Sequence, residues 1–354
     1  MTLAATTYAG DPSLPHEQLT VRRGARSGVY TVIAVHSTAL GPALGGCRMW
    51  SYPAVDDAVA DALRLAEAMT LKAAAAGLPL GGGKGVICLR PDQRDRRDLA
   101  LRDFADAVDA LDGRYVTAED VGTSVSDMAA IARTCDHVAG LPRSLGGSGD
   151  PSPFTAAGVL AAIRACCRHA FGSAELGGRR IAVVGIGNVG GRLARLLADA
   201  GAHLVLADVD QAKRSLALEL PHACWHDPAT AIRADVDVLS PCALGGVVDP
   251  ATAASLRCRV VCGAANNQLA GDDLAGVLAK RGILYAPDFV VNAGGLINIA
   301  CEVDGYDPAV AASRVEELAL RVERILDEAA ATATTPLAVA TRIARARLRA
   351  VSSG

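Results

Sequence analysis

Residues 181–208, IAVVGIGNVGGRLARLLADAGAHLVLAD, contain the pattern that decides the fold of half the chain. An apolar run ends in G-x-G-x-x-G, formed by Gly185, Gly187 and Gly190, and a helical pattern begins within this motif. The first glycine permits a tight turn, the second lets the backbone approach a pyrophosphate, and the third lets the helix pack on the strand. Because the N-terminus of such a helix attracts phosphates, the stretch predicts a dinucleotide site; the alternative is a glycine-rich turn without a ligand.

The acid at the end of LVLAD, Asp208, bears on the choice of dinucleotide. A carboxylate at the end of the second strand accepts hydrogen bonds from the ribose 2′-hydroxyl and repels a 2′-phosphate. This favours NAD over NADP, although Lys213 and Arg214 nearby keep NADP open.

Strand and helix patterns alternate from about residue 180 as far as ILYAPDFV, and this alternation predicts an α/β fold with a doubly wound parallel sheet. Upstream, LGGSGDPSPFT at 145–155 is dense in Gly, Pro and Ser and predicts a domain boundary or hinge. Long helices are expected near residues 308–330 and 337–350. The predicted domains are a first domain at 1–148, a Rossmann-type NAD-binding domain at 149–334, and a C-terminal helix at 335–354 that packs back on the first domain, with a cleft between the two domains.

Composition narrows the function class. The 354 residues are too many for one compact core, and 51% of them are hydrophobic. A net charge of −3 gives no electrostatic reason for binding nucleic acid or an anionic membrane. We expect a cytoplasmic protein, since no long apolar run or signal peptide is present. The ten cysteines show no C-x-x-C spacing and the histidines show no ligand spacing, so no metal site is predicted.

The first half also has an α/β pattern. The pattern predicts a strand at residues 29–36 and a loop at GPALGG. It predicts a long helix at residues 55–76, where apolar residues recur at helical spacing. LPLGGGKG is expected to break that helix before a short strand, VICL. A helix over RRDLALRDFADAVDAL and a strand in RYVTAEDVGTS follow.

Two lysines in AMTLKAAAAGLPLGGGKGVI are the first catalytic candidates, Lys72 near the end of the helix and Lys84 after three glycines. Both are expected to be buried, where each ammonium would depress the pKa of the other. The absent side chains at 81–83 would let a substrate lie against the backbone. Asp120 ends a strand and would pair with one lysine. The alternative is a pair of solvent-exposed lysines and an acid that caps a turn.

These segments resemble the amino-acid dehydrogenases of the glutamate/leucine/phenylalanine/valine group, and most of all its valine and leucine members. The matching stretches span roughly residues 30–300 in the family's order: HSTALGPALGGCRMW, AMTLKAAAAGLPLGGGKGVI, GRYVTAEDVGTSVSDM, GGSGDPSPFTAAGV, GIGNVGG, SPCALGGVVD, VVCGAANNQLA and RGILYAPDFVVNAGGLIN. The resemblance implies reversible oxidative deamination of an L-amino acid to a 2-oxo acid, with release of ammonia and NADH. It also implies a homo-oligomer, with the first domain binding substrate and mediating assembly.

The resemblance assigns roles to individual residues. Lys72 would bind the substrate α-carboxylate, Lys84 would be the acid/base that activates water, and Asp120 would hold the amino group and relay protons. The predicted substrate site comprises Lys72, Leu44, Gly45, Met69, Ala118, Asn266, Asn292, Leu296 and Ile299. The predicted cofactor site comprises Thr155, Gly185, Gly187, Asn188, Val189, Gly190, Asp208 and Asn266.

The resemblance also bears on specificity. Glutamate-specific relatives place a lysine where this chain has Leu44, and an unpaired γ-carboxylate against leucine would be desolvated without a partner. Ala118, Leu296 and Ile299 would surround the substrate side chain, so a branched aliphatic amino acid, valine or leucine, is predicted. An aromatic amino acid is the alternative. Gly85 stands where Ala or Ser is common.

Two other classes of protein are compatible with part of the pattern. An NAD-sensing regulator would use GIGNVGG but would leave Lys72, Lys84 and Asp120 unexplained. A hydroxy-acid dehydrogenase usually needs a histidine-centred proton shuttle, and none of the histidines lies in such a motif.

Overall fold

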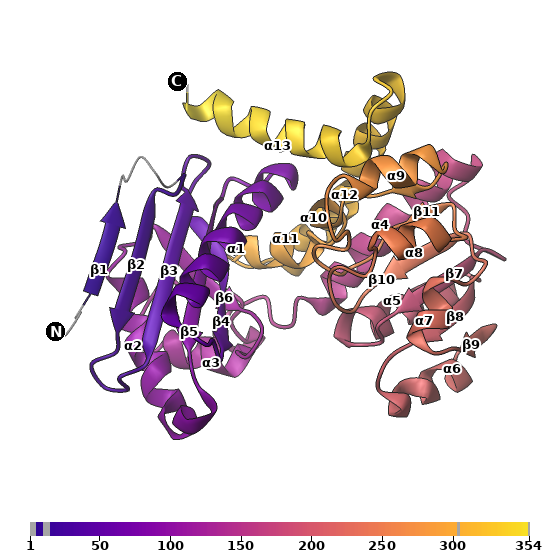
Figure 1. The fold of residues 1–354 in the computed structure, drawn as a ribbon. Coiled ribbons are helices and arrows are strands. Elements are labelled where there is room, and N and C mark those ends of the chain that lie inside the picture. Colours follow the sequence, from indigo (N-terminus) through magenta and orange to yellow (C-terminus); the bar gives the residue numbers. More distant parts are fainter. Residues whose placement is uncertain (1–4, 10–14, 303–304, 353–354) are drawn as a thin grey trace. The chain divides into compact units, whose positions relative to one another are not determined.

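The chain forms two compact units (Figure 1). The computed structural model describes residues 5–9, 15–302 and 305–352. Unit 1 is formed by the described residues of Met1–Asp150, Ile299–Pro308 and Ala344–Gly354, and unit 2 by Pro151–Asn298 and Ala309–Ile343. The predicted α/β fold in two domains is confirmed, whereas the cleft stays a prediction.

Unit 1 is built around a mixed sheet in the order β1-β2-β3-β5-β4-β6. Neighbouring strands from β1 to β5 are antiparallel, and β4 pairs in parallel with both β5 and β6. The strands are β1 (Ala5–Ala9), β2 (Gln18–Arg23), β3 (Tyr30–Ser37), β4 (Ala43–Trp50), β5 (Gly81–Cys88) and β6 (Tyr115–Glu119). The helices are α1 (Val55–Ala75), η1 (Pro91–Arg96), α2 (Arg97–Asp109), α3 (Val125–Ile131) and η2 (Arg143–Leu145).

Helix α1 covers one face of this sheet. Its buried alanines, Ala58, Ala62 and Ala66, recur at helical spacing and pack against Val32 of β3 and Val86 of β5. Alternation along the strands places every second residue of β4, β5 and β6 on this α1 face.

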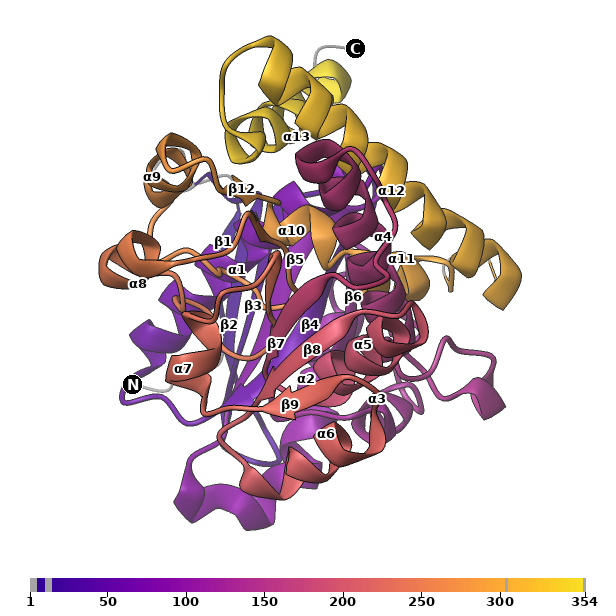
Figure 2. The same cartoon turned by 90° about the vertical axis from the view of Figure 1, so that its right-hand side faces the viewer.

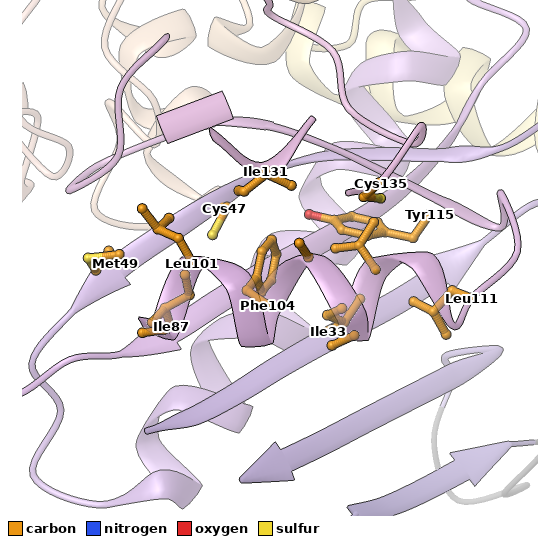
Figure 3. Packing of buried hydrophobic residues seen from close by; sticks show 14 of the residues in the cluster. Ile33, Cys47, Met49, Ile87, Leu101, Phe104, Leu111, Tyr115, Ile131 and Cys135 are labelled. Carbon is orange, nitrogen blue, oxygen red and sulfur yellow. The ribbon is translucent and has the colours of Figure 1, made fainter. Parts of the chain in front are cut away.

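Helices α2 and α3 contribute to a buried cluster on the opposite face. Figure 3 shows Phe104 of α2 at the centre of this cluster, with Tyr115, Cys47 and Ile131 around it. Each of these side chains is at most 1% exposed. Truncating a buried aromatic side chain of this kind costs about 3–5 kcal/mol, so the cluster contributes strongly to the stability of unit 1.

The prediction of a loop at GPALGG is wrong, because most of this segment lies in β4. LPLGGGKG follows the end of α1, as predicted, but the next strand, β5, already begins at Gly81 and is therefore longer than the predicted VICL. Close neighbours explain the glycines. A Cβ at Gly82 would lie 2.1 Å from the backbone nitrogen of Thr70 in α1, and a Cβ at Gly83 would lie 2.7 Å from the Tyr115 ring. The absent side chains therefore make room for α1 and Tyr115. The sequence pattern predicts that they make room for a substrate instead. Within a strand, glycine here marks the close approach of another element.

Unit 2 contains a parallel sheet in the order β12-β11-β10-β7-β8-β9, in which the strand order reverses between β7 and β10. This is the doubly wound arrangement that the sequence predicts. Figure 2 shows β7, β8 and β9 side by side. The strands are β7 (Arg180–Val184), β8 (His203–Ala207), β9 (Ala223–Trp225), β10 (Val238–Pro241), β11 (Val260–Val261) and β12 (Leu284–Tyr285). The helices are α4 (Ser152–Phe171), α5 (Asn188–Asp199), η3 (Gln211–Arg214), α6 (Ser215–Glu219), α7 (Pro228–Ile232), α8 (Pro250–Ser255), α9 (Leu274–Lys280) and α10 (Asp288–Val291).

Three further helices run through the points where the chain changes unit: α11 (Gly294–Ala300), α12 (Pro308–Ala331) and α13 (Pro336–Ser352). In α13 the residues from Ala344 onward belong to unit 1, and the Arg347 guanidinium donates to the carbonyl of Ala74 at 3.1 Å. Among the described residues, no helix has both the length and the apolar character that crossing a membrane requires.

Candidate active site

The interior of unit 1 contains an ion pair between two of the predicted residues. Lys84, on β5, is 4% exposed, and its Nζ lies 2.8 Å from Oδ2 of Asp120, which follows β6 directly. Burial lowers the pKa of Lys84, while Asp120 opposes this shift and Arg48 adds to it. Burial raises the pKa of Asp120, but Lys84 and Arg48 outweigh it, so the pKa is lowered. The pair therefore combines an ionised carboxylate with an amine that gives up its proton more readily than a solvent-exposed lysine.

Arg48 is a member of this site that the sequence did not single out. Its Nε donates to Asp120 Oδ2 at 3.0 Å, and its Nη1 donates to Asp61 Oδ2 at 2.9 Å. The Tyr52 hydroxyl also donates to Asp61 Oδ2, at 2.7 Å. The signal for Arg48 lay in GGCRMW, where a charged residue alternates with apolar ones, but its partners follow from the strand order.

The other predicted residues of unit 1 lie on α1, β4 and β6. Leu44 is 1% exposed and Ala118 4% exposed, and both lie on the α1 face, the face that carries Lys84. Gly45 is in the sheet, where its carbonyl accepts the Tyr115 hydroxyl at 2.6 Å. Met69 is half-buried on α1.

Lys72 differs from the expectation of two buried lysines. It lies in the last turn of α1 and is half-buried, so only Lys84 is fully buried. The cation that contributes to the lowered pKa of Lys84 is Arg48.

In unit 2 the glycine motif follows β7 and begins α5. Gly185 has a φ of +103°, and a Cβ there would lie 2.6 Å from the backbone nitrogen of Ala243. A Cβ at Gly190 would lie 1.9 Å from the carbonyl oxygen of Gly185. At Gly187, by contrast, a Cβ would meet no described atom within 4 Å. The first and third glycines are therefore required by the turn and the packing, while the backbone at the second is open to a ligand.

Asn188, Val189 and Gly190 form the first turn of α5, directly beyond this opening. Asp208 follows β8 and is 7% exposed; its Oδ2 accepts from the backbone N–H of Ile186 at 2.6 Å and from the Lys213 ammonium at 3.0 Å. Burial raises the pKa of Asp208, but hydrogen bonds from Asp210, Lys213 and Ile186 outweigh it, so the pKa is lowered. The carboxylate is thus ionised and braces the glycine turn.

The two predicted asparagines are also in contact. Asn292 Nδ2 donates to Asn266 Oδ1 at 2.7 Å and to the carbonyl of Ala264 at 3.1 Å, and Asn292 Oδ1 is buried without a hydrogen-bond partner among the described atoms. Gln268 was missed by the sequence reasoning: its Nε2 donates to the carbonyls of Gly263 and Ala265 at 2.7 and 3.0 Å. Gln268 therefore fixes the turn that carries Asn266.

The remaining predicted residues lie on α4 and α11. Thr155, in the first turn of α4, donates to the carbonyl of Pro151 at 3.1 Å and packs against Gly295, where a Cβ would lie 2.5 Å from its Oγ1. Leu296 and Ile299, both on α11, are each 8% exposed.

The cysteines are free thiols throughout, and burial raises the pKa of Cys47 far above its ordinary value. Within the described chain, no group of His, Cys, Asp or Glu side chains is arranged to hold a metal ion.

Sequence comparisons match both halves of the chain to one family. Residues 16–137 match the model described as Glu/Leu/Phe/Val dehydrogenase, dimerisation domain, and residues 207–343 match Glutamate/Leucine/Phenylalanine/Valine dehydrogenase. A leucine dehydrogenase of Bacillus subtilis is 45% identical over 312 residues, covering 88% of this chain and 85% of the relative. A valine dehydrogenase of Streptomyces virginiae is 44% identical over 336 residues, covering 94% of each.

Among solved structures, L-tryptophan dehydrogenase from Nostoc punctiforme is similar, with a TM-score of 0.83 and 35% sequence identity. The match covers 97% of this chain and 98% of that one.

Proposed function

Because this chain belongs to the glutamate/leucine/phenylalanine/valine dehydrogenase family, we propose that it catalyses NAD-dependent oxidative deamination of a branched-chain L-amino acid. L-Leucine or L-valine, water and NAD⁺ would yield the 2-oxo acid, ammonium, NADH and a proton, and the reaction is reversible. The observation that carries the proposal is the ion pair of the buried Lys84 and the half-buried Asp120, 2.8 Å apart on the same sheet face as Leu44.

Lys84 is suited to act as the acid and the base of this reaction. Because its pKa is lowered, Lys84 forms the neutral amine more readily than a solvent-exposed lysine does. The neutral amine would accept a proton from water as the water attacks the iminium carbon of the substrate. The ammonium so formed then donates a proton to the departing amine. Asp120 carries a negative charge beside this site and would hold the substrate amino group, so that Lys84 and Asp120 divide proton transfer and orientation between them.

The residues of unit 2 fit NAD. The opening at Gly187 and the first turn of α5 fit a pyrophosphate, and the ionised Asp208 fits the ribose 2′-hydroxyl. The unpartnered, buried Asn292 Oδ1 suits an amide donor such as the carboxamide of nicotinamide. When bound, NAD supplies the hydride acceptor. Asn266 and Asn292 would orient the nicotinamide and the substrate, and Thr155 would contact the cofactor.

The substrate side chain is proposed to be aliphatic because Leu44 offers no charge to a γ-carboxylate. The similarity to leucine and valine dehydrogenases supports this choice. Lys72 would bind the α-carboxylate, and Gly45, Met69, Ala118, Leu296 and Ile299 would complete the substrate site. An aromatic amino acid is the second candidate, favoured by the similarity to a tryptophan dehydrogenase.

We further propose that the protein is a cytoplasmic homo-oligomer. The match of residues 16–137 to a dimerisation domain supports self-association. The ten free cysteines are in keeping with a reducing compartment.

The proposed reaction is tested in the reductive direction with 4-methyl-2-oxopentanoate or 3-methyl-2-oxobutanoate and NADH. We expect loss of NADH absorbance that depends on ammonium. Turnover without ammonium would indicate a hydroxy-acid dehydrogenase instead, and the absence of turnover over a broad panel of oxo acids would indicate a non-enzymatic protein that binds NAD.

A further inference from the structure

We propose that Arg48 is a positioning residue that holds the Asp120 carboxylate by Oδ2 and so leaves Oδ1 to meet the substrate amino group. This inference rests on the proposed function and deepens it.

One oxygen of Asp120 carries both contacts to cations. Lys84 Nζ lies 2.8 Å from Oδ2 and Arg48 Nε lies 3.0 Å from the same atom. The backbone N–H of Asp120 is tied separately, to Thr123 Oγ1 at 3.0 Å. The residue is thus fixed both at its backbone and at Oδ2, the oxygen that carries the contact to each cation.

Arg48 is itself held from helix α1. Its Nη1 lies 2.9 Å from Asp61 Oδ2, and the Tyr52 hydroxyl donates to the same oxygen at 2.7 Å. The side chains of Arg48 and Asp61 are 23% and 18% exposed, so solvent screens this pair less than a surface pair. Burial raises the pKa of Tyr52, and the Asp61 carboxylate raises it further, so Tyr52 remains a donor. The guanidinium therefore bridges a carboxylate on helix α1 and one that follows strand β6.

Charge distinguishes this role from a purely structural one. The groups facing Lys84 are Asp120, Arg48 and Cys47, and Asp61 lies one contact further away through Arg48. Burial lowers the pKa of Lys84 most, Asp120 raises it, and Arg48 lowers it. Removing the Arg48 guanidinium would remove a positive charge that lowers the pKa of Lys84, while Asp120, which raises it, would remain. The pKa of Lys84 would therefore rise.

The test compares the full-length protein with Arg48→Gln, Arg48→Lys and a matched surface control, Arg90→Gln. Arg90 also uses Nε to bind a carboxylate, that of Asp92 at 3.2 Å, but both side chains are more than half exposed. The measurements are kcat and KM for L-leucine and the pH dependence of kcat/KM. For Arg48→Gln we expect kcat to fall on the order of 10²-fold with a smaller change in KM, since the amino group loses a positioned acceptor. The acid limb of the profile moves to higher pH.

Arg48→Lys keeps the positive charge but cannot contact Asp61 and Asp120 together. We therefore expect kcat to fall while the acid limb of the kcat/KM profile stays near its wild-type position. Arg90→Gln changes neither. The proposal would be overturned if Arg48→Gln folded and had the same kcat as Arg90→Gln, with the acid limb of its kcat/KM profile at the same pH. If Arg48→Gln does not fold, Asp61→Asn and Tyr52→Phe weaken the contacts that hold Arg48 from α1. A fall in kcat of roughly tenfold in Asp61→Asn supports the proposal. Wild-type kcat in both variants overturns it.

A second readout does not depend on turnover. Trace labelling with acetic anhydride over a range of pH, followed by mass spectrometry of the Lys84 peptide, reports the ionisation of Lys84, with the exposed Lys280 as internal reference. The midpoint for Lys84 is expected to rise in Arg48→Gln, and an unchanged midpoint would contradict the proposal. If the wild-type protein lacked dehydrogenase activity, the proposed function would fail, and this labelling would still decide the role of Arg48.

Discussion

Gly46 and Asp120 are in direct contact: a Cβ at Gly46 would lie 2.7 Å from Asp120 Cβ. Gly46 belongs to β4, which lies between β5, the strand of Lys84, and β6, the strand that ends before Asp120. Lys84 and Asp120 come from strands that are not paired, and they meet across β4 at the point where β4 has no side chain. The ion pair therefore depends on a glycine in the middle strand.

Substitution of that glycine is expected to disturb both stability and catalysis. In Gly46→Ala, the new methyl group collides with Asp120 Cβ and with the carbonyl oxygen of Glu119, both 2.7 Å away, so we expect a loss of about 1–3 kcal/mol in the free energy of unfolding and a lower kcat. Urea unfolding and steady-state kinetics measure the two effects. Gly276→Ala on α9 is the control, because its Cβ meets no described atom within 4 Å. Equal stability of both variants would show that the contact is not tight in solution.

Lys84→Ala is expected to abolish turnover while the affinity for NADH changes little. The lysine is the proposed acid and base, and it belongs to unit 1, whereas the proposed NAD-binding residues Gly187 and Asp208 belong to unit 2. Steady-state assays and titration of NADH fluorescence measure the two quantities. Lys280→Ala, at an exposed position, is the matched control. A loss of NADH affinity as large as the loss of kcat would contradict this division of roles.

The pH dependence of deamination follows from the direction of the Lys84 shift. Lys84 accepts a proton only when it is neutral, so kcat/KM is expected to fall as pH decreases through its pKa, which burial holds below the ordinary 10.5. Asp120 raises this pKa, so Asp120→Asn moves the acid limb to lower pH while kcat falls. This shift is opposite in direction to that of Arg48→Gln. An acid limb at the wild-type position in Asp120→Asn would mean that Lys84 is not the group that titrates.

Local patterns were sufficient to predict the fold of unit 2 but not the contacts around Lys84 and Asp120 in unit 1. The glycine motif and Asp208 lie within one strand–helix–strand segment, where sequence spacing fixes the geometry. In unit 1, glycines at 81–83 satisfy the pattern of a loop as well as that of a strand, and only the packing of α1 and Tyr115 decides between them.

The partners of Arg48 illustrate the same limit. Asp61 comes from α1 and Asp120 from the end of β6, and both reach Arg48 because β4 lies between β5 and β6. That strand order is not contiguous in the chain, so spacing along the sequence contains no direct sign of the contacts. Lys84 and Asp120 were candidates from their local patterns, a lysine after three glycines and an acid at the end of a strand. The family resemblance assigned their roles, but the pattern did not say which lysine pairs with Asp120.

Cofactor preference is expected to depend on Asp208. Removing the carboxylate in Asp208→Ala deletes the acceptor for the ribose 2′-hydroxyl and frees Lys213, whose ammonium lies 3.0 Å from Oδ2, to attract a 2′-phosphate. We expect kcat/KM with NAD to fall. We also expect the ratio of kcat/KM with NADP to kcat/KM with NAD to rise. Asp210→Ala is the control, because Asp210 caps η3 two residues away and its carboxylate accepts from Ala212. If the ratio of NAD to NADP efficiency were the same in wild type and Asp208→Ala, Asp208 would not contact the ribose.

The central claim, deamination of a branched aliphatic L-amino acid, is tested most directly by kcat/KM with NAD for L-leucine, L-valine, L-isoleucine, L-phenylalanine, L-tryptophan and L-glutamate. We expect the highest efficiency with leucine or valine, because the buried Leu44 offers apolar contact and no charge. Discrimination among the branched substrates is expected to be graded, about 10–200-fold per methylene at most. Highest efficiency with glutamate would contradict the role of Leu44, and highest efficiency with phenylalanine or tryptophan would contradict the assignment to branched substrates.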